Sequence, residues 1–243
     1  MTFPVRGRRP NVPTRVRSVS DVTAHMREIE LAGPDLPRLT CRPGAHVVLH
    51  VPTATGVARR VYSAWQFAPR QSRLVLRVAV HAGDAPACVW ARSVRPGDPV
   101  TIEPPRRKIS PDPAAAFHVF AGDETAAVPL LAMRAALGPA APVFGVFEAA
   151  EAADEVPDFP GADPLPWVHR GRASAVSSPV LLRAVQGLDL PPGRGVAYLA
   201  GENGTCRLLQ RHFIEQRRWP RAAVLTQAHW APGRPGFGAG ADR

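Results

Sequence analysis

The sequence contains little cysteine and no long apolar run. Its three cysteines, Cys41, Cys88 and Cys206, are odd in number and far apart, which argues against a disulfide framework and a CxxC metal site. No run of about 18 uncharged apolar residues is present to cross a bilayer. The segment from Met1 to Arg17 carries arginines but lacks the apolar stretch of a secretory signal. We therefore expect reduced thiols in a soluble, cytoplasmic protein.

Lysine is almost absent as well, and Lys108 is the single example. The formal net charge is nevertheless +10, because arginine is abundant. A nucleic-acid interface requires clustered cations, whereas these arginines are scattered from end to end. We therefore expect no nucleic-acid partner, and a small anionic ligand explains the charge equally well. With 243 residues, the chain exceeds the usual domain of about 100–200 residues, which predicts two domains. We expect a monomer.

Short stretches that favour strands, separated by proline and glycine, fill the N-terminal part of the chain. In residues 73–81, Leu74, Leu76, Val78 and Val80 recur at every second position, which predicts one continuous apolar face. Several such strands with almost no helical period predict a small antiparallel β-barrel over residues 1–110. The predicted strands are residues 14–19, 25–31, 45–51, 73–81 and 99–103.

Strands and helices alternate after Pro113. Predicted strands cover residues 117–121, 142–147, 167–169, 195–200 and 222–227, and predicted helices cover a stretch ending at 137, then 178–188 and 205–217. This alternation predicts parallel βαβ units in an α/β domain over residues 111–232. Pro129 predicts that the first helix starts late or kinks. Residues 233–243 are rich in glycine and proline, which predicts a flexible tail.

Arg60, Tyr62 and Ser63 form an Arg-x-Tyr-Ser pattern at the start of a predicted barrel strand. The pattern is similar to the flavin motif of flavin-dependent NAD(P)H reductases, which also join a barrel to a βαβ domain. In that motif the aromatic ring covers the isoalloxazine, the hydroxyl can hydrogen-bond near its reactive nitrogen, and arginine neutralises phosphate. The pattern taken alone is equally compatible with an ordinary half-buried strand tyrosine.

Four further segments accompany this motif in order and spacing over residues 10–233. They are His81-Ala-Gly-Asp-Ala-Pro-Ala-Cys-Val-Trp-Ala91 followed by Pro96-Gly-Asp98, Ala121-Gly-Asp-Glu-Thr-Ala126, Trp167-Val-His-Arg170, and Ala200-Gly-Glu202 with Arg207 and Arg211-His212 beyond it. Together they resemble the siderophore-interacting protein family of bacterial FAD-containing ferric-siderophore reductases. The resemblance implies a ferredoxin-reductase-like fold, an FAD cofactor, NADPH or NADH as the electron donor, and a ferric siderophore as the substrate.

The resemblance also implies roles for particular residues. Backbone N–H groups of residues 81–90 are expected to face the FAD pyrophosphate at a helix start. Asp123 and Glu124 are expected in the cleft between the domains, although acidic residues at a helix start also stabilise the helix dipole. The expected cofactor-binding residues are Arg60, Tyr62, Ser63, His81, Ala85, Ala87, Cys88, Asp123, Glu124, Thr125, Gly201, Glu202 and Trp230.

No acid–base pair is expected, because the cofactor carries the redox chemistry. We expect Arg106, Arg107 and Lys108 to form a basic rim at the domain junction that binds the anionic substrate, the alternative being a solvated linker. His46 and His50 share one face of a strand, but no third ligand is evident, so no metal site is expected.

Several positions depart from the family pattern. Ala85 and Cys88 replace a glycine and a serine, Trp65 replaces an arginine, and His229 replaces the tyrosine of a terminal Gly-Tyr-Trp. A methyl group obstructs the close approach of the backbone to a phosphate. These departures leave a second hypothesis open: a non-redox catalyst, such as a cyclase, or a binding protein that holds an organic biosynthetic intermediate in the interdomain cleft.

Overall fold

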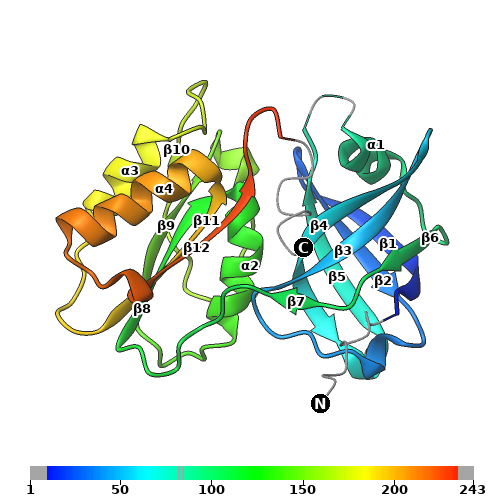
Figure 1. Cartoon of the computed structure of the whole chain (residues 1–243), viewed down its shortest axis with the longest axis horizontal. Coiled ribbons are helices and arrows are strands. Elements are labelled where there is room, and N and C mark those ends of the chain that lie inside the picture. Colours follow the sequence, from blue (N-terminus) through cyan, green and yellow to red (C-terminus); the bar gives the residue numbers. More distant parts are fainter. Residues whose placement is uncertain (1–9, 82, 84, 235–243) are drawn as a thin grey trace, which may run out of the picture.

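The computed structural model describes residues 10–81, 83 and 85–234, so the predicted tail from residue 235 lies outside the described residues. An antiparallel sheet forms the N-terminal half (Figure 1). Its strand order is β4-β5-β2-β1-β6-β3-β7, and pairing of β4 with β3 closes the first six strands into the predicted barrel. The strands are β1 (Val12–Thr23), β2 (Met26–Ala32), β3 (Ala45–Thr53), β4 (Gly56–Ala68), β5 (Arg73–Ala79), β6 (Pro99–Ile102) and β7 (Arg106–Arg107).

Alternation along the strands fills the barrel. Leu74, Leu76 and Val78 of β5 belong to the barrel core, as the pattern predicts, whereas Val75 on the opposite face packs against the second domain. Helix α1 (Pro86–Ser93) places Trp90 in the same barrel core. Short 3₁₀ turns at Leu36–Arg38 and Pro69–Gln71 join the strands. The Arg60–Ser63 motif lies in the middle of β4, so the prediction that it starts a strand is wrong.

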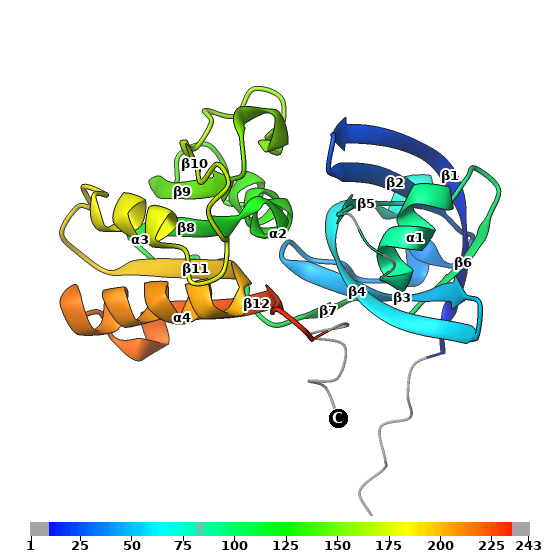
Figure 2. The same cartoon turned by 90° about the horizontal axis from the view of Figure 1, so that it is seen from above.

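A parallel five-stranded sheet forms the C-terminal half, with the order β10-β9-β8-β11-β12. Helix α2 packs on the face towards the barrel, and α3 and α4 pack on the other face (Figure 2). The elements are β8 (Phe117–Asp123), α2 (Glu124–Ala135), β9 (Val143–Ala149), β10 (Trp167–His169), α3 (Pro179–Gln186), β11 (Gly195–Glu202), α4 (Asn203–Arg211) and β12 (Val224–Trp230), with 3₁₀ turns at Ala152–Asp154 and Arg221–Ala223. None of the helices in the described part of the chain is long and apolar enough to cross a membrane.

Two predicted helices differ from the structure in detail. Helix α2 begins at Glu124 and continues through Pro129, so the alternative that it starts late is wrong. The proline removes a single backbone hydrogen bond near the helix start, and the buried residues from Ala126 to Met133 hold this helix between the two domains. The helix predicted over residues 205–217 ends at Arg211 and continues as a π turn, His212–Gln216.

The two halves share a hydrophobic core. Trp65 lies at a β-bulge in β4 and belongs to the same buried cluster as Phe120 and helix α2. Its ring stacks on Phe159 with centroids 4.1 Å apart, and the Arg77 guanidinium lies 3.7 Å from the ring centroid. The residue that replaces the family's arginine therefore joins the domains.

Candidate functional site

The predicted flavin residues of the barrel come together although they are distant in sequence. Tyr62 is mostly buried against the barrel core. Burial raises the pKa of its phenol, the nearby Cys88 thiol raises it further, and Arg60 lowers it. The Arg60 guanidinium donates to the Arg59 carbonyl at 2.8 Å. Helix α1 therefore places the Cys88 segment beside the Arg60–Tyr62 motif.

Ser63 lies on the opposite face of β4 from Arg60 and Tyr62, because side chains alternate along a strand. Ser63 is paired with His46 of β3, and His46 is paired with Arg106 of β7. These pairings place Ser63 and the predicted basic rim in one row that runs towards the domain junction.

Helix α1 begins at Pro86, directly after its N-cap residue Ala85. Among the described residues, no side chain caps this end and no acidic residue occupies its first turn. The N-cap, Ala85, has φ −56°, a conformation open to any residue, so the backbone there does not demand the family's glycine. Arg92 donates to the carbonyls of His81 and Gly83, at 3.0 Å and 2.8 Å, and so fixes the preceding segment. Ala87 occupies the first turn and is half-buried.

Asp123 forms the centre of the C-terminal site, at the end of β8. Its Oδ1 accepts hydrogen bonds from the backbone N–H groups of Thr125 and Ala126, at 2.9 Å and 3.2 Å. Its Oδ2 accepts from the backbone N–H of Glu202 and from the Trp230 indole, both at 2.8 Å. The structure thus brings together four of the predicted residues, Asp123, Thr125, Glu202 and Trp230. Their hydrogen bonds, however, are made to one another.

Glu202, at the end of β11, caps the start of helix α4. Its Oε2 accepts from the backbone N–H groups of Thr205, at 2.7 Å, and of Ser177, at 3.0 Å. Burial alone would raise the pKa of Glu202, but these backbone hydrogen bonds lower it below its usual value. The carboxylate is therefore a stable, ionised cap.

A third carboxylate, Glu148 at the end of β9, was not predicted as a site residue. It accepts from the Ser178 hydroxyl, and from the Leu181 N–H at 3.1 Å, at the start of α3. Arg170 lies 3.6 Å from Glu148 and makes a bidentate pair with Glu124, at 3.1 Å and 3.2 Å. The sequence could have predicted Glu148, because this residue ends an apolar strand just as Asp123 does.

His229 is the second residue that the site prediction left out. The Thr125 hydroxyl donates to Asp123 at 2.6 Å, so at 3.3 Å it can accept the Nδ1–H of His229. This assigns the proton to Nδ1, and leaves Nε2 buried and without a hydrogen-bond partner in the described part of the chain. Burial and then the Lys108 charge lower the pKa of His229 to about 4. The imidazole is therefore neutral near pH 7.

The predicted basic rim is only partly free. Arg106 lies 3.5 Å from the buried carboxylate of Glu103, which Arg59 also meets at 2.7 Å and His50 at 3.3 Å. Arg107 and Lys108 are exposed. Arg106 is therefore held by a carboxylate of the barrel.

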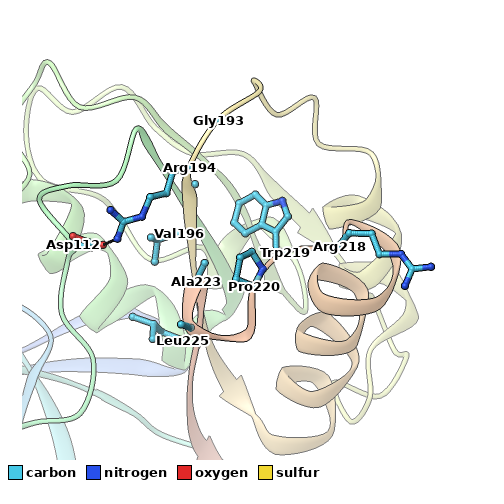
Figure 3. Close-up of a pocket in the computed structure, with 11 residues that line it drawn as sticks. Asp112, Gly193, Arg194, Val196, Arg218, Trp219, Pro220, Ala223 and Leu225 are labelled. Carbon is cyan, nitrogen blue, oxygen red and sulfur yellow. Dashed lines mark hydrogen bonds and ion pairs between the residues drawn. The ribbon is translucent and has the colours of Figure 1, made fainter.

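A separate cavity of about 530 Å³ lies at the other end of the sheet (Figure 3). It opens beside the first residues of β11 and β12, between Trp219 and the ion pair of Arg194 with Asp112, 2.9 Å apart. Ligands of open α/β sheets bind at the carboxyl ends of strands, so we do not assign it a cofactor. No group of three or more His, Cys, Asp or Glu side chains is arranged for a metal within residues 10–81, 83 and 85–234.

The residues fit the two implied cofactors unequally. The open start of α1, with the nearby Arg60 and Arg92 and the ring of Tyr62, fits FAD. The starts of α2, α3 and α4 are occupied by Asp123, Glu148 and Glu202. These helix starts do not fit the pyrophosphate of a nicotinamide dinucleotide.

A closed antiparallel barrel followed by a parallel α/β sheet is the ferredoxin-reductase-like fold, and the site supports the class of flavin-dependent oxidoreductases. Residues 115–233 match the family model described as "Siderophore-interacting protein", and residues 45–109 match that of the "Siderophore-interacting FAD-binding domain". The chain belongs to the siderophore-interacting protein family.

Individual relatives agree with this assignment. The crystal structure of a siderophore utilization protein from T. fusca is 25% identical, with a TM-score of 0.82, over 94% of this chain and 95% of that chain. An uncharacterized protein of Mycobacterium tuberculosis is 28% identical over 76% of this chain and 69% of its own length. The cytochrome P450 reductase GcoB of Amycolatopsis, 23% identical with a TM-score of 0.73 over 92% of this chain and 70% of that chain, shares the fold.

Proposed function

We propose that this protein is a flavin-dependent reductase of ferric siderophores, with FAD as its cofactor and a reduced nicotinamide nucleotide as its electron donor. The observation that carries the proposal is the open start of helix α1 beside the Arg60–Tyr62 motif. FAD, when bound, supplies the redox chemistry, because a flavin accepts two electrons together and passes them on singly. Each ferric ion of the substrate accepts one electron and leaves as the less tightly held ferrous ion.

The chain's own residues would bind and orient the reactants. Tyr62 would cover the flavin ring, and Arg60 with the N–H groups at the start of α1 would meet the pyrophosphate. Ser63, on the opposite face of β4 from Tyr62, would offer its hydroxyl to the flavin edge. Arg107 and Lys108, exposed at this junction, would attract an anionic ferric chelate.

The visible spectrum of the purified protein tests the proposal. We expect a yellow protein that releases FAD, and not FMN, on denaturation, because the match to the family extends to the segment proposed to hold the pyrophosphate. Under anaerobic conditions, the reduced flavin should be reoxidised by a ferric siderophore. A protein that stays colourless with excess FAD would remove the proposal.

The non-redox hypothesis predicts a different result. A cyclase or a binding protein would use the interdomain junction for an organic intermediate, and its flavin, if bound, would be inert towards ferric chelates. Flavin that is reduced by dithionite but is not reoxidised by any ferric siderophore would favour this second function.

A further inference from the structure

The crevice where a dinucleotide would be expected is filled by the protein itself. In open α/β sheets, ligands bind outside the carboxyl ends of the strands, where the strand order reverses. The order β10-β9-β8-β11-β12 places this point between β8 and β11. The Asp123 carboxylate lies across it, bonded to the start of α2 on one side and to the Glu202 N–H on the other.

Two glycines of this edge make room for carboxylates of the chain. A Cβ on Gly201, which has φ +107°, would lie 2.5 Å from Oδ2 of Asp123. A Cβ on Gly204 would lie 2.4 Å from the Ser177 hydroxyl and 3.0 Å from Oε2 of Glu202. The space beside these two glycines is therefore taken by Asp123 and by Ser177 with Glu202.

The edge also has the wrong charge for a phosphate. Asp123, Glu124, Glu148 and Glu202 gather there, and Arg170 is bonded to Glu124 and lies 3.6 Å from Glu148. Burial first, and then the charges of Asp123 and Glu202, raise the pKa of the Cys206 thiol in helix α4. The carboxylates of Asp123 and Glu202 thus lie at the start of helix α4, which would otherwise attract an anion.

We infer that the α/β domain does not hold a nicotinamide dinucleotide by its pyrophosphate, and that it recognises the electron donor by its reduced nicotinamide half. NADH, NADPH and reduced nicotinamide mononucleotide then reduce the flavin at similar rates. Binding energy from remote parts of a substrate normally increases the rate at the reacting centre, and the starts of α2, α3 and α4, occupied by Asp123, Glu148 and Glu202, offer no such contact to the pyrophosphate. The expected similarity of the three rates, the rate statement, rests on the proposed function. The expected absence of binding through the pyrophosphate, the binding statement, does not.

Titration with ADP-ribose tests the binding statement directly. ADP-ribose carries the pyrophosphate and the adenosine but no nicotinamide, and its binding to the FAD-loaded protein can be followed by calorimetry. We expect no saturable binding at concentrations up to about 1 mM. A saturable isotherm in that range, abolished by disrupting the start of α2 or α4, would overturn the inference whether or not the protein is a reductase.

The substitution Glu202→Ser tests the physical cause. Serine can cap helix α4 with its hydroxyl, but it removes the carboxylate from the crevice. We expect ADP-ribose binding to appear in this variant and to remain absent from Glu215→Ser, a matched change at an exposed site in the π turn. If a folded Glu202→Ser protein gains no binding, the carboxylate is not what excludes the pyrophosphate, and the inference fails.

Anaerobic stopped-flow reduction of the bound flavin tests the rate statement. We expect the second-order rate constants for the three donors to agree within about threefold. A preference of tenfold or more for NADH or NADPH over the mononucleotide would overturn the inference. If none of the donors reduces the flavin, the proposed donor is wrong, and the ADP-ribose titration still decides the binding statement.

Discussion

The two halves of this molecule begin their helices differently. Helix α1 of the barrel starts without a side-chain cap in the described part of the chain, whereas α2, α3 and α4 start on Asp123, Ser178 with Glu148, and Glu202. The first N–H groups of any helix lack partners within the helix and attract anions. A helix start can bind an anion only where the chain leaves those groups free, so the proposed phosphate site lies in the barrel and the inferred exclusion of a phosphate lies in the α/β domain.

The largest effect is expected from removing the central cap. Asp123→Ala deprives two helix-start N–H groups, the Glu202 N–H and the Trp230 indole of their acceptor. We expect the free energy of unfolding to fall by about 3–4 kcal/mol, measured by urea denaturation. Asp189→Ala, at an exposed site, is the control. A loss below about 1 kcal/mol for Asp123→Ala would mean that water replaces these bonds.

The pH dependence of stability should reveal His229. Its pKa is lowered to about 4 in the folded protein, against about 6.5 in an unfolded chain. Between these values the unfolded chain binds a proton that the folded protein does not, so stability falls as pH decreases through this window, by up to about 3 kcal/mol.

His229→Phe removes the titrating group and should flatten that part of the profile. The measurement is urea unfolding of both proteins at pH values of about 7 and about 4.5. Equal pH slopes in the two proteins would show that the imidazole titrates normally in the folded state. Above about pH 6.5, His229 contributes no pH dependence.

A carboxylate cap can also be placed at the helix start of the barrel. Ala85→Asp places at the start of α1 the residue type that closes α2. We expect the affinity for FAD to fall about tenfold, because the carboxylate competes with the pyrophosphate for the same N–H groups, while the helix itself gains stability.

Fluorescence titrations with FAD and with riboflavin measure this effect. Riboflavin lacks the pyrophosphate, so its affinity should not change, and Ala85→Asn serves as the uncharged control. If Ala85→Asp weakens FAD and riboflavin equally, the start of α1 does not meet the pyrophosphate.

The smallest effect concerns the exposed cations of the junction. Replacing both Arg107 and Lys108 by alanine should slow association with a ferric catecholate a few-fold at low salt, because exposed charges act over about 8–10 Å at moderate ionic strength. The association rate, followed by flavin fluorescence, should also depend less on salt. Arg70→Ala, a single exposed cation in the 3₁₀ turn Pro69–Gln71, is the control. An unchanged salt response would identify residues 107–108 as a solvated linker.

The sequence alone determined the architecture, because the patterns that encode it are local. Alternation in β5 predicted the barrel face, and the change of period after Pro113 predicted the parallel sheet. The order of the motifs also predicted which strand ends meet: Asp123, Gly201, Glu202 and Trp230 do lie together. Parallel strands bring their carboxyl ends to one edge, so this part of the site follows from topology.

The hydrogen-bond partners of those residues are visible only in the folded chain. The hydrogen bonds from Glu202 and Trp230 to Asp123 join residues 79 and 107 positions apart, and no local pattern specifies such partners. The same holds for Glu148 with Ser178 and for Trp65 against Phe159. The sequence does not show whether a carboxylate at a strand end faces a ligand or a neighbouring N–H. Burial and partner geometry decide between the two, and both exist only in the folded chain.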